Sequence, residues 1–356
     1  MNTCKLILVG GFLGAGKTSL LWRAAEQIKA SGESVGLITN DQATDLVDTA
    51  FLSEQENLVR EVSGSCFCCN FNGFADAIAY IADKNAGGTI LAEPVGSCTD
   101  LSATLMQPLK DKYADAVRLS PLTVVADPDR LRGILDGSDT PAAYIGRKQF
   151  EEADIILINK IDLLDEAARK KLQQRAAQEW PQAKVLLASV KDGSGITEWL
   201  ELVQQAQPVG THLADVDYDI YAAGEAAYGW LNASYAIQGS GDFAQAADQL
   251  LHRLSEAFDG RNASVGHVKF LLQAPDHQWI GNLTGRAETA VLRDSAHAGQ
   301  PMLTVNARVE IGPDDLSEIV SQAVCQAFDG IALEQTANNC LIPGRPNPTY
   351  RYHEVI

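Results

Sequence analysis

The chain has 356 residues and a formal net charge of −18, so we expect two domains and no affinity for nucleic acids or anionic membranes, whose phosphates need a basic partner surface. No apolar run approaches the roughly 20 residues that span a bilayer. The first predicted strand begins within a few residues of Met1, which leaves no room for a signal peptide.

The first predicted strand and helix enclose a phosphate-binding loop. The apolar run at residues 6–9 is followed by a G-x-x-x-x-G-K-[ST] motif and then by a helical apolar pattern at residues 20–28. In such a loop, backbone N–H groups surround a β-phosphate, Lys17 neutralises phosphate charge and the Thr18 hydroxyl ligates Mg²⁺. The motif therefore predicts a nucleoside triphosphate, with these contacts: Gly11, Gly14, Ala15, Gly16, Lys17, Thr18 and Ser19.

Further apolar runs predict a doubly wound α/β domain. They lie at residues 34–39, 57–62, 89–93, 122–126, 154–158 and 184–188, mostly separated by helical patterns. Ligand loops are expected at the carboxyl ends of these strands. We predict that this domain spans residues 1–208 and that a polar, acidic linker follows at residues 209–219.

Three thiols lie between the second and third of these runs, at Cys66, Cys68 and Cys69. Three thiolates in one turn can converge on a soft transition metal and leave a fourth position open for exchange. The alternative is that they are small apolar residues buried in the fold. The total of seven cysteines is odd and does not indicate a disulfide framework, so reduced thiols and a cytoplasmic location are expected.

Two later loops indicate which base the nucleotide carries. Asn159, Lys160 and Asp162 form an N-K-x-D motif directly after a buried strand. A carboxylate at Asp162 can accept from guanine N1–H and the exocyclic amine together, whereas adenine offers no such pair of donors. Ser189 and Val190 follow the next strand, where a loop would close over guanine O6, so GTP is the predicted nucleotide.

The second half of the chain has a different pattern. Strands are predicted at residues 228–238, 265–273, 279–283, 289–293 and 302–311, with helices at residues 242–258 and 313–328. This predicts a smaller α+β domain at residues 220–335 and an extended tail at residues 336–356. No motif here identifies a client-binding surface.

Taken together, the P-loop, the Cys66-Phe67-Cys68-Cys69 cluster, the Glu93-Pro94-Val95-Gly96 turn and the N-K-x-D motif resemble the CobW-type GTPases, relatives of HypB and UreG. The resemblance covers the first two hundred residues, and it implies a GTP-hydrolysing metallochaperone. Such a protein binds a transition metal at its CxCC motif and delivers it to a client metalloprotein or a cofactor-insertion enzyme. The resemblance also admits a homodimer.

The resemblance implies further site residues around the nucleotide. Residues 40–43 with Asp48 resemble the family's switch segment, although Asp41, Gln42 and Ala43 depart from its usual sequence. Asp41, Asp48 and Glu93 are candidates for water-mediated contacts to Mg²⁺, the alternative being solvated loop carboxylates. Lys17, Thr18 and Glu93 are the predicted catalytic residues, acting by positioning and charge neutralisation.

The sequence leaves the cargo metal and the role of one cysteine open. The His-rich stretch of many zinc-handling members is absent, so Zn²⁺, Co²⁺ and Ni²⁺ all remain candidates. Cys98 follows Glu93 by five residues and is a candidate for the open coordination position in one nucleotide state. The alternative is an apolar cysteine packed at a helix start.

Two other functional classes compete with the metallochaperone. One is a regulatory GTPase whose cysteines are redox-active or structural and carry no cargo metal. The other is a P-loop kinase or cobalamin-pathway enzyme acting on a small molecule, with Glu93 as a base. The N-K-x-D motif argues against the second class because most small-molecule kinases use ATP.

Overall fold

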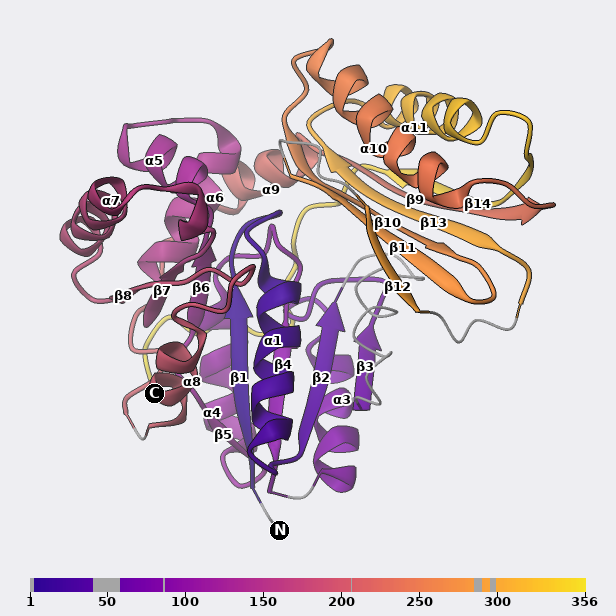
Figure 1. Cartoon of the computed structure of the whole chain (residues 1–356). Coiled ribbons are helices and arrows are strands. Elements are labelled where there is room, and N and C mark those ends of the chain that lie inside the picture. Colours follow the sequence, from indigo (N-terminus) through magenta and orange to yellow (C-terminus); the bar gives the residue numbers. More distant parts are fainter. Residues whose placement is uncertain (1–2, 41–57, 86, 206, 285–289, 295–298) are drawn as a thin grey trace. The chain divides into compact units, whose positions relative to one another are not determined.

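The computed structural model describes residues 3–40, 58–85, 87–205, 207–284, 290–294 and 299–356, which divide into two compact units (Figure 1). The first unit contains the described residues up to 224 together with residues 345–356. The second contains the described residues from 225 to 344. The chain therefore returns to its first unit for its last twelve residues.

The first unit is built on a parallel sheet in the order β3-β2-β4-β1-β6-β7-β8, with β5 also paired to β1. Its strands are β1 (Cys4–Gly10), β2 (Val35–Asn40), β3 (Leu58–Val62), β4 (Thr89–Glu93), β5 (Val117–Leu119), β6 (Thr123–Ala126), β7 (Ile155–Ile158) and β8 (Lys184–Leu187). The strands are apolar almost throughout because helices cover both faces of the sheet.

Alternate side chains of each strand pack into two different cores. In β7, Ile155 and Leu157 face a core shared with α1 and α8, whereas Ile156 and Ile158 face a core shared with α5, α6 and α7. The helices are α1 (Lys17–Ala30), α3 (Phe71–Lys84), α4 (Gln107–Tyr113), α5 (Pro128–Leu135), α6 (Pro141–Glu151), α7 (Glu166–Glu179), α8 (Ile196–Gln204) and α9 (Tyr218–Ala226). A π-helical turn, Ser102–Met106, leads directly into α4.

The second unit is an antiparallel sheet in the order β12-β11-β10-β13-β9-β14, covered on one face by two helices (Figure 1). Its elements are β9 (Gly229–Gln238), α10 (Phe243–Asp259), β10 (Val265–Gln273), β11 (His277–Leu283), β12 (Val291–Asp294), β13 (Met302–Val309), α11 (Pro313–Ala327) and β14 (Ala332–Leu341). The apolar stripe of α10 supplies Ala247, Leu250, Leu254 and Phe258 to the core of this unit.

These two units confirm the predicted fold class, a doubly wound α/β domain with a smaller α+β domain. One expectation about the chain's end was wrong. Residues 336–341 belong to the ten-residue strand β14, of which nine residues pair with β9, and are not part of an extended tail. Within the described part of the chain, no helix combines the length and apolarity that a membrane span requires.

Candidate nucleotide and metal sites

The P-loop connects β1 to α1 and is held in shape by its glycines. Gly11 has φ +127°, and a Cβ there would lie 2.3 Å from the carbonyl oxygen of Val125 in β6. Gly16 has φ +97° and immediately precedes α1, so Lys17 and Thr18 form the first turn of that helix. Backbone N–H groups and the positive end of the α1 dipole thus lie at this loop, as phosphate binding requires.

The three residues predicted to be catalytic lie together. Glu93 ends β4, the strand beside β1, and its Oε1 accepts a hydrogen bond of 3.2 Å from Thr18 Oγ1. Lys17 Nζ lies 3.7 Å from the same carboxylate oxygen. A hydroxyl and a carboxylate oxygen at this separation form the hard oxygen donor set that suits Mg²⁺. The other candidates for contacts to Mg²⁺, Asp41 and Asp48, lie outside the described residues.

The N-K-x-D motif is joined to both the P-loop and the loop after β8. Asn159 Nδ2 donates to the carbonyl oxygen of Ala15 (2.9 Å), and Asn159 Oδ1 accepts from the backbone N–H of Val190 (3.0 Å). Ser189 Oγ donates to Asp162 Oδ1 at 2.8 Å, which fixes the orientation of the carboxylate. One face therefore carries the predicted phosphate loop and both predicted base loops.

Lys160 occupies the left-handed region, with φ 58°, and its Nζ donates to Asp127 Oδ2 at 2.9 Å. Asp127 lies just before α5, where it caps the helix by accepting from Asp129 N and Arg130 N. Lys160 and these backbone N–H groups lower the pKa of Asp127 against the opposing effect of burial. This ion pair holds the N-K-x-D loop in place.

Cys66, Cys68 and Cys69 have sulfur atoms that all lie within 4.8 Å of one another. The Sγ of Cys66 is 3.0 Å from that of Cys68 and 3.1 Å from that of Cys69. Hydrogen bonds from Cys68, and then from Cys69 and Cys98, lower the pKa of the Cys66 thiol well below its usual value. Hydrogen bonds with Cys66 raise the pKa of the Cys68 and Cys69 thiols in turn, so the three sulfur atoms share one thiolate. Three sulfur atoms this close have the donor chemistry of a soft-metal site.

The cysteine turn is fixed to the sheet and to α3. Asn40, the last residue of β2, donates through Nδ2 to the carbonyl oxygens of Val62 and Ser65, and its Oδ1 accepts from the backbone N–H of Phe67. The Phe67 ring stacks on Phe74 of α3 with centroids 4.1 Å apart. The turn, which follows β3, is therefore anchored to the end of β2, the strand that leads into residues 41–43 of the predicted switch.

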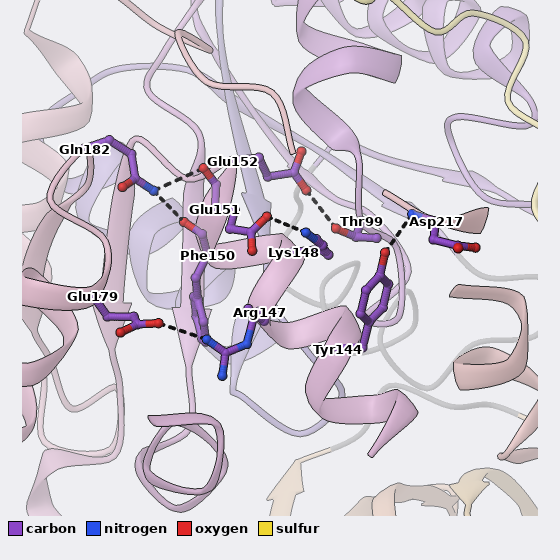
Figure 2. A network of polar contacts seen from close by, with 10 residues as sticks. All are labelled: Thr99, Tyr144, Arg147, Lys148, Phe150, Glu151, Glu152, Glu179, Gln182 and Asp217. Carbon is purple, nitrogen blue, oxygen red and sulfur yellow. Dashed lines mark hydrogen bonds and ion pairs between the residues drawn. The ribbon is translucent and has the colours of Figure 1, made fainter. Parts of the chain in front are cut away.

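The segment after Glu93 is buried and clamped by α6. Gln149 Nε2 donates to the carbonyl oxygens of Gly96 (3.0 Å) and Cys98 (2.7 Å). Glu152, directly after α6, accepts from Thr99 Oγ1 (3.2 Å) and from the backbone N–H of Ser102 (2.7 Å). Figure 2 shows the contact between Glu152 and Thr99 beside the surface pairs of α6. The segment that starts beside the P-loop is thus firmly held as far as Ser102.

The last residues of the chain run across the cysteine turn. The backbone N–H of Asn347 donates to Cys69 Sγ (3.3 Å), and the backbone N–H of Thr349 donates to the carbonyl oxygen of Cys68 (2.8 Å). Arg351 Nε donates to Asp100 Oδ2 at 2.6 Å. Asp100 is fully buried and has φ 64°, which is strained for a non-glycine residue, so Arg351 stabilises a conformation that the segment around Cys98 requires.

Burial of Glu152 predicts a pH effect on stability. Desolvation, and then the charge of Asp100, raise the pKa of Glu152 from 4.5 to about 8. The folded state therefore holds a proton that the unfolded state releases. The free energy of unfolding should accordingly fall between about pH 4.5 and about pH 8, by up to about 1.4 kcal/mol per pH unit from this group.

Chemical denaturation at several pH values checks this effect, and a Glu152→Gln variant should show a flatter dependence across that range. Glu179→Gln is the matched control, because Glu179 makes only a partly exposed ion pair with Arg147 (Figure 2). An unchanged slope in Glu152→Gln would show that Glu152 does not bind this proton.

A family model described as the CobW/HypB/UreG nucleotide-binding domain matches residues 5–187, more than half of the chain. The chain belongs to the CobW/HypB/UreG family. This confirms the resemblance inferred from the motifs, and it covers the P-loop, the cysteine turn and the N-K-x-D motif.

Named relatives match about half of the chain. Zinc-regulated GTPase metalloprotein activator 1 of Schizosaccharomyces pombe is 28% identical over 211 residues, which are 57% of this chain and 50% of the relative. Zinc chaperone YjiA of Escherichia coli is 27% identical over 181 residues, 50% and 55% of the two chains. Hydrogenase maturation factor HypB of Azotobacter vinelandii is 27% identical over 205 residues, 56% and 59%. The chain spans about half the length of the curated relatives it matches.

Solved structures that resemble the chain include Zn(II)-bound YjiA GTPase from E. coli, with 17% identity, a TM-score of 0.39, and coverage of 92% of this chain and 99% of that one. HypB from Helicobacter pylori in complex with nickel has 16% identity, a TM-score of 0.44, and coverage of 58% and 92%.

Several residues of this CobW/HypB/UreG member were not singled out from the sequence. Asn40 was noted only as part of the switch segment, and its position at the end of a buried strand is the signal that could have indicated a structural role. Asp100, Gln149 and Arg351 gave no signal, because their contacts join segments far apart in the chain.

Proposed function

We propose that the chain is a GTP-hydrolysing metallochaperone that binds a soft transition metal through Cys66, Cys68 and Cys69 and delivers it to a client metalloprotein or a cofactor-insertion enzyme. The observation that carries the proposal is the group of three sulfur atoms within 4.8 Å in a chain that also has a P-loop. Relatives named as zinc chaperones, a metalloprotein activator and a hydrogenase maturation factor support it.

Lys17 and Thr18 would contact the phosphates of GTP, and the two base loops would contact its guanine. Lys17 neutralises charge on the β- and γ-phosphates, and Asp162 accepts from the guanine edge while Ser189 holds it in place. Thr18, with Glu93 nearby, would hold Mg²⁺, which would supply positive charge to neutralise the charge that develops on the phosphates. Hydrolysis needs no covalent intermediate.

Two segments would link the nucleotide to the metal. The Thr18 hydroxyl that donates to Glu93 is the group expected to ligate Mg²⁺, so nucleotide binding changes the partners of Glu93. From Glu93 the chain runs through a buried turn to Cys98, whose side chain is among the groups that lower the pKa of the Cys66 thiol. Asn40 supplies the second link, because it ends β2 and holds the backbone of residues 62–67.

None of the seven cysteines, all of which lie among the described residues, forms a disulfide, and this agrees with the reducing cytoplasm that we propose as the location. The cargo metal is not fixed by the three-cysteine turn alone, since Zn²⁺, Co²⁺ and Ni²⁺ all accept thiolate ligands.

Equilibrium dialysis of the full chain with Zn²⁺ or Co²⁺, in the presence of Mg²⁺ with either GTP or GDP, tests the proposal. We expect one tightly bound metal ion per chain and an affinity that differs between the two nucleotides. Cys66→Ser should lose this binding, whereas Cys325→Ser should retain it because Cys325 is an exposed residue of α11. Binding that is absent, or that ignores the nucleotide, would favour the regulatory GTPase with redox or structural cysteines.

A further inference from the structure

Residues 342–356, all of which the structure describes, lie in no helix or strand. β14 ends at Leu341, and prolines follow at positions 343, 346 and 348. Proline fixes its own φ and carries no N–H group, so this segment is stiff and does not continue the β14 ladder. Residues 345–352, here called the strap, belong to the first unit and make their hydrogen bonds to other elements of that unit.

The strap is joined to the cysteine turn through Asn347 and Thr349. The backbone N–H of Asn347 donates to Cys69 Sγ at 3.3 Å. The backbone N–H of Thr349 donates to the carbonyl oxygen of Cys68 at 2.8 Å, and Thr349 Oγ1 donates to the carbonyl oxygen of Cys69 at 3.1 Å. The strap therefore holds both the backbone of the turn and one of its sulfur atoms.

The strap lies on the accessible side of the turn. Cys66 and Cys68 are buried, whereas Cys69 is partly exposed. Metal exchange between thiols requires the incoming sulfur to reach the ion, so exchange takes place on the Cys69 side. The N–H of Asn347, which points at the Cys69 sulfur, occupies a position that an incoming group must take.

A buried ion pair holds the strap in place. Arg351 Nε donates to Asp100 Oδ2 at 2.6 Å, and Asp100 is 0% exposed. The hydroxyl of Tyr218 donates to the same oxygen at 2.8 Å, and the Arg351 guanidinium lies 5.0 Å from the centre of the Tyr218 ring. Release of Arg351 leaves a buried carboxylate without this cation, which is costly. The pair therefore favours the closed strap.

The remaining contacts of the strap are peripheral to the core. The Tyr350 ring packs edge-on against Phe71, the first residue of α3, with centroids 5.1 Å apart. Tyr352 donates through its backbone N–H to Ala103 and through its hydroxyl to Asp111. Apart from Pro346, every strap residue is at least partly exposed. The strap can therefore leave the turn without opening a hydrophobic core.

We propose that the strap is a cover over the metal site, and that metal enters and leaves the cysteine turn only after the pair between Arg351 and Asp100 opens. This inference rests on the proposed function and adds the element that controls exchange. A closed strap keeps competing thiols and chelators away from a bound ion. A client that displaces the strap gains access to the ion.

Alkylation of the thiols in the metal-free full chain tests the cover directly. Iodoacetamide labelling followed by mass spectrometry of the peptides gives a separate rate for Cys69, and the exposed Cys325 of α11 is the internal reference. Arg351→Ala should raise the Cys69 rate at least about tenfold, because it removes a hydrogen bond between charged groups. The Cys325 rate should not change. Equal Cys69 rates in the two proteins would overturn the proposal.

Two further variants keep the test decisive if Arg351→Ala unfolds. Thr349→Val has the same shape and loses only the hydroxyl bond to Cys69, so the Cys69 rate should rise about threefold, and an unchanged rate would contradict the proposal. Arg345→Ala is the matched control, because the ion pair of Arg345 with Asp219 is exposed on both sides and its loss should leave the rate unchanged. Thermal unfolding of each variant shows whether the fold is intact.

Removal of Zn²⁺ from the loaded chain by a chelator extends the test to the metal. We expect faster removal from Arg351→Ala and an unchanged rate for Arg345→Ala. Faster labelling of Cys69 with an unchanged rate of Zn²⁺ removal would show that the strap does not control exchange, and the metallochaperone proposal would stand. A wild-type chain that binds no Zn²⁺, Co²⁺ or Ni²⁺ would instead overturn both proposals.

Discussion

Lys17→Ala should reduce GTP hydrolysis by at least about 10²-fold while the chain remains folded, a loss comparable to the removal of one preorganised charge-stabilising group from an active site. Lys17 stands in the first turn of α1, with its Nζ 3.4 Å from the carbonyl oxygen of Phe12 and 3.7 Å from Glu93. These contacts hold the Lys17 ammonium group over the P-loop. No other described residue of the loop carries a positive charge.

Single-turnover phosphate release at saturating GTP measures this effect separately from binding. Lys29→Ala is the control, because Lys29 lies in the last turn of the same helix and away from the loop. Thermal unfolding should be similar for both variants. A Lys17→Ala protein that keeps its full turnover would show that this loop does not support the chemistry, whatever nucleotide it binds.

All strands of the first unit except the three-residue β5 could be predicted from the sequence because parallel strands covered on both faces appear as continuous apolar runs. β14 could not. Seven of its ten residues are exposed, and Glu334, Asn338 and Asn339 interrupt any apolar alternation, so an edge strand looked like part of a polar tail. The strand exists because β9 offers backbone partners to nine of its residues, on both sides of an irregularity at Thr336, which only the folded chain reveals.

Some parts of the candidate site could likewise be predicted from the sequence, and others could not. Lys17, Thr18, Asp162 and the three clustered cysteines could be found because their chemistry depends on short local spacing. The contacts that organise them are distant in sequence. Arg351 pairs with Asp100 across 251 positions, so no local pattern could have placed the chain's last residues beside the cysteine turn.

Asp162→Asn should weaken GTP binding by about 10²-fold and shift the preference toward xanthosine triphosphate, because the variant loses charge-assisted hydrogen bonds to the guanine edge. The hydrogen bond between Ser189 and Asp162 explains why the preference should shift toward xanthosine triphosphate. Ser189 Oγ donates to Asp162 Oδ1 at 2.8 Å, so an asparagine keeps its amide oxygen toward Ser189 and turns its NH₂ group toward the base. The xanthine 2-carbonyl accepts from that group, whereas the guanine amine repels it.

Competition binding with GTP, xanthosine triphosphate and ATP, each with Mg²⁺, measures the preference of the wild-type chain and the variant. Asp192→Asn is the matched control: Asp192 lies in the loop after β8, accepts from Ser194 and is exposed, so the same loss of charge should leave the base preference unchanged. Equal affinity of the wild-type chain for ATP and GTP would remove guanine recognition from the proposal. A preference for GTP that persists in Asp162→Asn would place that recognition elsewhere, since the carboxylate would then not be the group that reads the base.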